Sequence, residues 1–401
     1  MSADPAWAFF VLVALAWAVA RLPLFRAVDS PPDGPQHFVS VDGLRGFLAL
    51  AVFVYHLVVT HRFIDDGVWQ APDSRFQALL GPIGVSMFFM ITGFLFWGKL
   101  LRCQGAPRWL SLYIGRLMRI GPLYLAVVVA MLVIVALRTG LQLHDPAQDV
   151  LSSVLRWLAL GVLDSQPDVN GYPARHVLAG VTWTIHYEWL FYASLLVIAP
   201  FARGRRHGVF VAIALVTCVL GKLVWHMHSM GLAALFLYGM AVASLLHEPR
   251  WRALSQRLSP RQWSMLVLAC MVAVFAVPGG GYGSLVGALL ALAFGAVCTG
   301  ATLFGLLTSA PARRLGAISY GLYLMQGLVL TLVFAIAPLR SAAIASVAVY
   351  WAAGAACLLL LLLAALAAHL AIERPGIALG VRWARQLRGR AARGAPLLTS
   401  R

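Results

Sequence analysis

Residues 41–56 read VDGLRGFLALAVFVYH, and this stretch organises the rest of the chain. An Asp-Gly-Leu-Arg-Gly segment precedes an apolar helix that contains a single histidine deep within it. Arg45 and His56 are eleven residues apart, and a helical step of about 100° per residue returns them to nearly one azimuth, about 16 Å apart along the axis. We therefore expect the two side chains on one face of a membrane helix.

The position of His56 within this helix has two interpretations. A titratable side chain past the middle of the hydrocarbon is costly unless it faces the bundle interior or a wet cavity, which makes His56 a candidate functional residue. The alternative is that His56 forms a hydrogen bond with a neighbouring helix and that Arg45 only fixes the topology at the membrane boundary. This stretch alone is compatible with both.

The composition excludes a soluble globular protein. Hydrophobic residues make up 61% of the 401 residues and charged residues only 11%, and the mean hydropathy is +0.84, which is typical of a polytopic helical membrane protein. The net charge of +17 comes almost entirely from arginines in short clusters between apolar runs. Topology and anionic head groups explain it better than nucleic acid does. The five cysteines form no CxxC pair, so we expect neither a disulfide framework nor a metal site.

The apolar runs predict an all-α fold, a polytopic transmembrane helical bundle with ten core spans and an additional N-terminal helix. The run Val150 to Leu163 is too short for a span and would break the alternation of loops, so we interpret it as a re-entrant or interfacial helix. The ten core runs lie at about 44–61, 79–101, 119–137, 181–201, 209–225, 231–246, 263–278, 283–306, 317–337 and 341–370.

The basic clusters between these runs fall on one side of the membrane if each run crosses once. By the positive-inside rule that side is the cytoplasm, and the opposite loops are acidic or neutral. The chain then divides into an N-terminal helix with a Pro-rich linker (1–40), a membrane domain (41–375) and a basic cytoplasmic tail (376–401).

The first apolar segment, Trp7 to Phe25, has two interpretations. Its Ala18-Val19-Ala20 has the small-x-small form of a signal-peptide cleavage site, but a basic region in front of it is missing. We therefore expect an uncleaved helix whose N-terminus lies outside.

The stretch YIGRLMRIGPLY at residues 113–124 places Arg116 and Arg119 three residues apart at a cytoplasmic helix start. Two guanidinium groups on one helix face suit phosphate oxygens, which accept charge-assisted, bidentate hydrogen bonds. The alternative is a positive anchor that only fixes the topology.

The stretch TWTIHYEWLFY at residues 182–192 carries the one glutamate within a long apolar run. Thr184, Glu188 and Tyr192 follow a four-residue step and share a polar face, with Trp183 and Tyr187 beside it. A carboxylate at this depth must be protonated, paired or wet. We expect Glu188 either to orient or charge-balance the histidine, or to form an ion pair with an arginine.

The order of motifs along the chain resembles that of the acyltransferase-3 family of membrane acyltransferases. From about residue 41 to 375 the chain contains DGLRG…H, GVSMFFMITGFL, RLMRIGPLY, TWTIHYEWLFY, ISYGLYLMQ and IERP. The resemblance implies ten core helices and the transfer of an acyl group, often acetyl from acetyl-CoA, to sugars of exported glycans. Some members of the family acylate small molecules such as macrolides.

The resemblance also implies roles for individual residues. His56 matches the catalytic histidine, Arg45 its motif partner, and Glu188 the acidic residue of its segment. Arg116 and Arg119 match paired arginines that contact CoA phosphates. We expect substrate contacts from a further set, namely Trp183, Tyr187, Tyr192, Tyr320 and Gln326.

Gln326 departs from the pattern of the family. It closes the late motif, Ser319 to Gln326, at a position where the family often has histidine. Glutamine can donate and accept hydrogen bonds but cannot relay a proton at neutral pH. The acceptor or the rate of this protein is therefore expected to differ from those of relatives that have the histidine.

The sequence thus predicts an acyltransferase of the bacterial inner membrane with a cytoplasmic C-terminus. It would move an acyl group, expected to be acetyl, from cytoplasmic acyl-CoA to a hydroxyl of an exported or cell-surface glycan. Acyl-CoA is a co-substrate, and neither a permanently bound cofactor nor nucleic acid is expected. His56 would act as a general base or as an acyl carrier. The alternatives are a small-molecule acceptor, and a non-enzymatic transporter of a lipid-linked or glycan intermediate, which a buried histidine and glutamate also suit.

Overall fold

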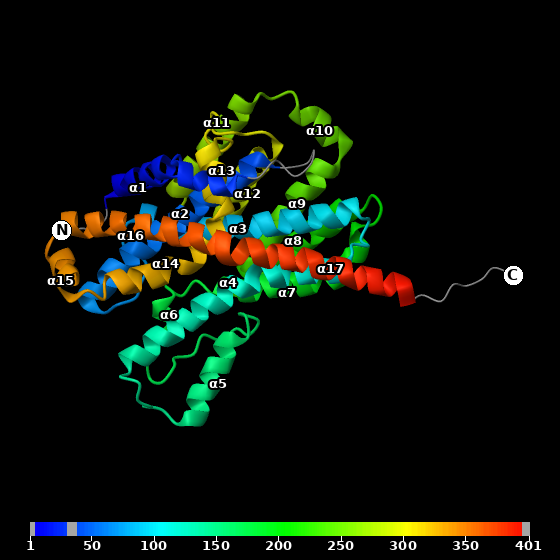
Figure 1. Ribbon diagram of the computed structural model, residues 1–401. Helices are drawn as coiled ribbons and strands as arrows, with labels where there is room; N and C mark the ends of the chain where they lie inside the picture. Colours follow the sequence, from blue (N-terminus) through cyan, green and yellow to red (C-terminus); the bar gives the residue numbers. More distant parts are fainter. Residues whose placement is uncertain (1–4, 30–37, 395–401) are drawn as a thin grey trace.

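The computed structural model describes residues 5–29 and 38–394, with side chains up to residue 387. The predicted Pro-rich stretch Ser30 to Gln36 and the end of the predicted tail, residues 395–401, lie outside the described residues. Within those ranges the chain is helical and has no β-strand, only one isolated bridge between Val169 and Tyr172. Figure 1 shows the helices gathered in one bundle, with α5 set apart from it. The prediction of an all-α fold is confirmed.

The helices follow one another in the order given next, where η1 and η2 are 3₁₀-helices and η3 is a π-helix. They are α1 (Ala6–Val19), η1 (Pro23–Val28), α2 (Val39–Asp66), α3 (Arg75–Arg102), α4 (Trp109–Arg138), α5 (Ala147–Leu158), α6 (Ala174–Val177), α7 (Trp183–Ile198), η2 (Ala199–Ala202), α8 (His207–Trp225), α9 (His228–His247), α10 (Pro249–Ser255), α11 (Pro260–Ala276), α12 (Ser284–Thr299), α13 (Ala310–Ala317), α14 (Ser319–Val333), α15 (Ala337–Ala345), α16 (Val347–Ala368), η3 (His369–Glu373) and α17 (Arg374–Gly394).

Among the described residues, seven helices are long and apolar enough to cross a membrane. Two bent helix pairs, α10 with α11 and α13 with α14, raise the number to nine if each pair counts as one span. The chain is therefore a multi-pass membrane protein, but the prediction of ten core spans is not confirmed. Each of the ten apolar runs contains a helix, yet α12 has only 16 residues and reaches about 24 Å, less than the hydrocarbon thickness of about 30 Å.

The backbone breaks in the run 283–306 explain its short helix. α12 ends where Gly300 adopts a φ of 155°, a conformation that glycine tolerates and side chains disfavour. Leu303 and Phe304, with φ values of 47° and 58°, turn the chain again. Hydropathy along the run carries no trace of these turns, which bring the following segment back to the start of α2.

The two glycines of the DGLRG motif allow this return. A side chain at Gly43 would overlap the backbone of Leu307, and one at Gly46 would overlap Leu315. On the other side of the same contact, a side chain at Gly316 would overlap the backbone of Asp42. The motif glycines therefore serve close packing of α13 on α2, and this contact fixes the height of Arg45 in the bundle.

Helix α3 lies at the centre of the bundle, against α2 on one side and α9 on the other. A side chain at Gly84 would overlap Val52 of α2, and one at Gly93 would overlap the backbone of Phe236 of α9. Small residues thus let the helix backbones approach closely, as membrane helix packing requires. The second motif of the chain therefore acts in helix packing.

Helices α16 and α17 form one long rod, drawn in orange and red in Figure 1, which η3 joins without a turn. The start of the predicted basic tail is helical and packs on α4. Gly376 and Gly380 both lie against Met118. The π-helix η3 stands at the joint between α16 and α17, and Glu373 is its last residue.

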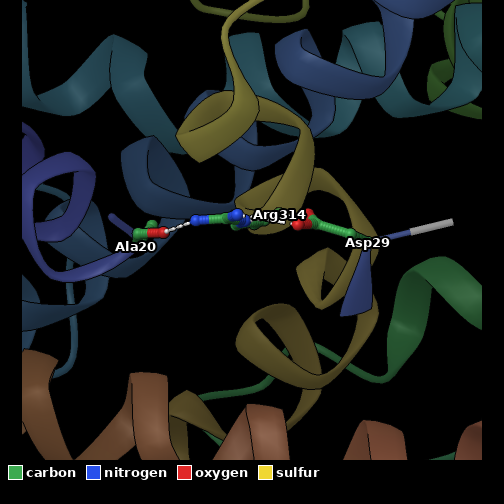
Figure 2. Close-up of polar contacts among 3 residues, drawn as sticks. All are labelled: Ala20, Asp29 and Arg314. Carbon is green, nitrogen blue, oxygen red and sulfur yellow. Dashed lines mark hydrogen bonds and ion pairs between the residues drawn. The ribbon is translucent and has the colours of Figure 1, made fainter. Parts of the chain in front are cut away.

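The N-terminal segment is clamped to α13, as Figure 2 shows. Nη1 of Arg314 donates a hydrogen bond to the Ala20 carbonyl at 3.0 Å. Its Nε and Nη2 donate to the two carboxylate oxygens of Asp29 at 2.8 and 2.7 Å. Helix α1 ends at Val19, earlier than the predicted end at Phe25, and Pro23 begins the 3₁₀-helix η1.

Helix α5 corresponds to the short run Val150 to Leu163. It spans twelve residues and begins and ends earlier than that run. Its Trp157 is buried, and the Trp157 carbonyl accepts a hydrogen bond from Tyr124 of α4 at 3.0 Å. Leu151 and Leu155 are exposed. The helix is too short to cross a membrane.

Candidate active site

A cavity of about 180 Å³ opens inside the bundle where α2, α3, α4, α7 and α14 meet. We name it the arginine cavity, because three arginines from two helices line it. Seven residues singled out from the sequence meet there, which are Arg45, Arg116, Arg119, Thr184, Glu188, Tyr192 and Tyr320.

The three arginines of this cavity act on one another and on buried acids. Arg45 lies within electrostatic range of Arg116, Glu188 and Glu373. The Arg116 guanidinium stacks over the Phe96 ring at 4.9 Å from its centroid, a cation–π contact that leaves the guanidinium edge free to bind oxygen atoms. The cluster therefore suits an anion with several oxygens.

Glu188 lies among the arginines. Its Oε2 accepts a hydrogen bond from the Tyr192 hydroxyl at 3.2 Å, and its Oε1 faces the Thr92 hydroxyl at 3.5 Å. The electrostatic partners of its carboxylate are Arg116, Arg119 and Arg45. Glu188 thus lies within electrostatic range of the arginines, but it forms no ion pair with them among the described residues, and its role stays a prediction.

Glu373 is a site residue that the sequence argument missed. Its side chain is 2% exposed, it lies within electrostatic range of Arg45 and Arg119, and its Oε2 is 3.3 Å from Nδ1 of His369. The π-helix that contains it matters, because such turns often mark functional sites. The IERP motif already contained the signal, a glutamate at the end of the longest apolar run.

Tyr320 and Tyr323 of α14 close the cavity opposite the arginines. The Tyr320 hydroxyl donates to the Ile120 carbonyl at 2.9 Å. The Tyr323 hydroxyl donates to the Val181 carbonyl at 3.1 Å and lies 3.0 Å from the Thr184 hydroxyl. The expected polar face of Thr184, Glu188 and Tyr192 is thus confirmed, since all three line the cavity.

His56 lies eleven residues beyond Arg45 on α2, part of its surface is accessible, and it is not among the residues that line the arginine cavity. Its Nδ1 is 3.0 Å from the Val52 carbonyl. A carbonyl only accepts, so the neutral ring carries its proton on Nδ1 and leaves the lone pair of Nε2 free. The backbone therefore orients the imidazole for proton transfer.

The side chain of Gln326 lies near this imidazole and influences it. Its Nε2 donates to the Tyr323 carbonyl at 2.9 Å, and its buried Oε1 has no hydrogen-bond partner among the described residues. Gln326 is one helical turn beyond Tyr323 on α14, so this helix leads from the arginine cavity to His56.

Gln326 is not among the residues that line the arginine cavity, and neither are two aromatic residues predicted to contact substrate, Trp183 and Tyr187. Their rings contact each other at 5.7 Å, and Tyr187 faces an apolar hollow between α7, α8 and α9. Trp183 packs on Phe89 and Tyr282. Their role in substrate binding stays a prediction.

The fold and this site define a multi-pass helical membrane protein with a cationic cavity inside its bundle. Residues 38–369 match a family described as "Acyltransferase domain", the acyltransferase-3 family, and the chain belongs to this family. No curated protein and no solved structure matches the chain.

Membership confirms the resemblance and decides between two of the expected functions. The protein is an acyltransferase, so it uses an acyl donor and an acyl acceptor. The expectation of a non-enzymatic transporter is therefore wrong.

Proposed function

We propose that the protein transfers an acetyl group from cytoplasmic acetyl-CoA to a hydroxyl of an exported or cell-surface glycan in the bacterial inner membrane. The observation that carries this proposal is the arginine cavity, from which α14 leads to Gln326 beside His56. A donor held by its phosphates at the arginines would extend its thioester toward the histidine.

The arginines suit CoA because the donor carries phosphates far from its reacting thioester. Arg116 and Arg119 would bind phosphate oxygens through charge-assisted hydrogen bonds. Glu188 and Glu373 would keep the guanidinium groups positioned when the cavity is empty, since an isolated charge in the bundle is costly. The arginine pair is thereby a donor-binding element.

His56 would supply the proton transfer. The acceptor hydroxyl attacks the thioester carbonyl, the C–S bond breaks and an ester C–O bond forms. Nε2 of His56 takes the hydroxyl proton and returns it to the leaving thiolate, so that CoA departs as a thiol. Gln326 would stabilise the imidazolium by accepting one N–H hydrogen bond through its Oε1.

In a second version of this step, Nε2 of His56 attacks the thioester first and carries the acetyl group. Single-turnover mixing separates the two versions. Radiolabel that appears on the protein before the acceptor is added, and leaves with it, indicates the acyl carrier. Label that never resides on the protein indicates the general base.

The test uses the purified protein in lipid vesicles with radiolabelled acetyl-CoA and an envelope glycan extract. We expect CoA release and label on the glycan with the wild type and with His247→Ala, a matched histidine variant at the exposed end of α9. His56→Ala should lose at least a hundredfold in rate, because a general base contributes about 10²- to 10⁴-fold. Full transfer by a folded His56→Ala protein would refute the proposal.

The cytoplasmic position of the donor has its own test. Acetyl-CoA does not cross membranes, so inside-out membrane vesicles should release CoA at once and right-side-out vesicles only after permeabilisation. The reverse order would place the arginine cavity on the outer side.

A further inference from the structure

A second cavity, of about 160 Å³, lies at the opposite end of the same helices. The C-terminal ends of α2, α4 and α14 form it together with the segment around α6. We name it the tryptophan cavity, and its characteristic lining residues are Trp69, Arg138, Tyr172, His176 and Arg340.

The two cavities flank His56. On α2, Arg45 lines the arginine cavity and Thr60 lines the tryptophan cavity, with His56 between them. On α14, Tyr323 lines the first and Gly327 the second, with Gln326 between them. A donor in one cavity and an acceptor in the other would therefore meet at the His56–Gln326 pair.

An aromatic stack connects the tryptophan cavity to the imidazole. The Trp69 ring stacks on His176 at 5.0 Å with 17° between the planes. Its centroid is 6.4 Å from that of His56, with 28° between those planes. Broad aromatic faces with polar edges suit a ring that has both apolar and hydroxyl-bearing sides.

The charged residues that line the tryptophan cavity are all basic. Arg138 and Arg340 are exposed and contribute to the lining, and no residue that lines this cavity is acidic. In the part of the chain that the structure describes, neither arginine forms an ion pair with a carboxylate. Two free guanidinium groups beside an aromatic stack recognise a carboxylate or a phosphate.

His176 adds an unsatisfied polar group at the same place. Both ring nitrogens are buried and have no hydrogen-bond partner among the described residues. Burial, and the nearby Arg175, lower the pKa of His176 below its usual value of 6.5, so the neutral ring offers one donor and one acceptor. Such orphaned groups are costly, and a bound ligand satisfies them.

We propose that the tryptophan cavity binds the acceptor, and that this acceptor carries an anionic group, a carboxylate or a phosphate, beside the hydroxyl that is acetylated. The proposal rests on the proposed function and names the chemical class of its acceptor. The sugar ring stacks at Trp69 and His176, the anion binds Arg138 and Arg340, and the hydroxyl points toward His56.

The test measures acceptor binding and acetyl transfer separately, with the full chain in lipid nanodiscs. The probes are tetragalacturonate and its carboxyl-reduced neutral counterpart, and a polyprenyl-phosphate sugar beside the same sugar on an uncharged lipid. We expect tighter binding of the charged member of at least one pair, by about tenfold or more, as charge-assisted hydrogen bonds imply. The pair that shows the preference identifies the source of the anion.

The variants Arg138→Gln and Arg340→Gln should each remove most of that preference. Binding of acetyl-CoA, measured without acceptor, should keep the wild-type affinity, because neither arginine lines the arginine cavity. Arg156→Gln, at an exposed position of α5, is the matched control and should behave as the wild type.

Three outcomes would overturn the inference: equal binding of the charged and neutral member in both pairs, unchanged preference in both arginine variants, or loss of acetyl-CoA binding in those variants. These outcomes leave the proposed function standing as long as the wild type transfers acetyl to an envelope glycan. Failure of the wild type to use acetyl-CoA at all refutes the proposed function instead.

Discussion

Gln326 of α14 lies next to the imidazole of His56 on α2, at the point where two cavities approach each other from opposite ends of the bundle. The family often has histidine at this position of the late motif. In this chain the neighbour of His56 is therefore a glutamine, which can form hydrogen bonds but cannot take up a proton.

We expect Gln326→Ala to lower kcat about ten- to a hundredfold without a change in the KM for acetyl-CoA. The reason is the loss of one hydrogen bond to a charged imidazolium, which contributes about 1.5–3 kcal/mol. Gln326→His should retain more activity than Gln326→Ala and add a second titration to the pH–rate profile between pH 5 and 8. Initial rates from pH 5 to 9 measure both effects, and an unchanged kcat in Gln326→Ala would exclude this role.

The paired arginines should act on donor binding. We expect Arg116→Gln and Arg119→Gln each to raise the KM for acetyl-CoA about tenfold or more, because each loses a charge-assisted contact to phosphate. Arg108→Gln, at an exposed position just before the same helix, should keep the wild-type KM. Equal KM values in all three variants would show that the pair serves topology alone.

Glu373 should stabilise the arginine cluster. Glu373→Gln removes a negative charge that lies within electrostatic range of Arg45 and Arg119, and charges inside the bundle are costly without compensation. We expect a lower midpoint of thermal unfolding in detergent. Glu248→Gln, whose side chain is 49% exposed, is the matched control. A midpoint as high as that of the control would mean that Glu373 does not balance the arginines.

The contact between Arg314 and Asp29 predicts a pH dependence of stability. The hydrogen bond from Arg314 lowers the pKa of the Asp29 carboxyl below its usual value of 3.8. The contribution of this contact to the free energy of unfolding is therefore complete above about pH 5. It is lost as the pH falls below 3.8 through the folded-state pKa of Asp29. About half of the Asp29 side chain is exposed, so the contribution stays below about 1 kcal/mol.

Thermal unfolding of the wild type and of Asp29→Asn at pH 6, 5, 4 and 3 measures this dependence. The difference between the two proteins should be largest at pH 6 and should shrink as the pH falls below 3.8. The double variant with Arg314→Gln removes the partner, and a difference that persists in that background would assign the effect to another group.

Much of the arginine cavity could be predicted from the sequence, because helical spacing places residues on faces. Thr184, Glu188 and Tyr192 share a face through their four-residue step, and all three line the cavity. The same geometry explains why Trp183 and Tyr187 point elsewhere, since each precedes a member of that face by one residue, about 100° around the helix.

Other features depend on backbone breaks and on contacts between distant segments. The count of ten spans is not confirmed, and hydropathy does not reveal the turn at Gly300 or the 64° bend between α13 and α14. The tryptophan cavity combines Trp69, which lies between helices, with residues on α2, α4, α6, α14 and α15. In the sequence, the one signal of the tryptophan cavity is the presence of arginines, Arg138 and Arg340 among them, on the side of the membrane where the loops are expected to be acidic or neutral.

The clamp at Ala20 also sets an order of events during synthesis. Arg314 follows Ala20 by 294 residues, which a ribosome adds in about 15–60 s at about 5–20 residues per second. During that time the Ala20 carbonyl lacks the hydrogen bond from Arg314 that later holds it against α13. The N-terminal helix, although made first, is thus secured only after most of the bundle has left the ribosome.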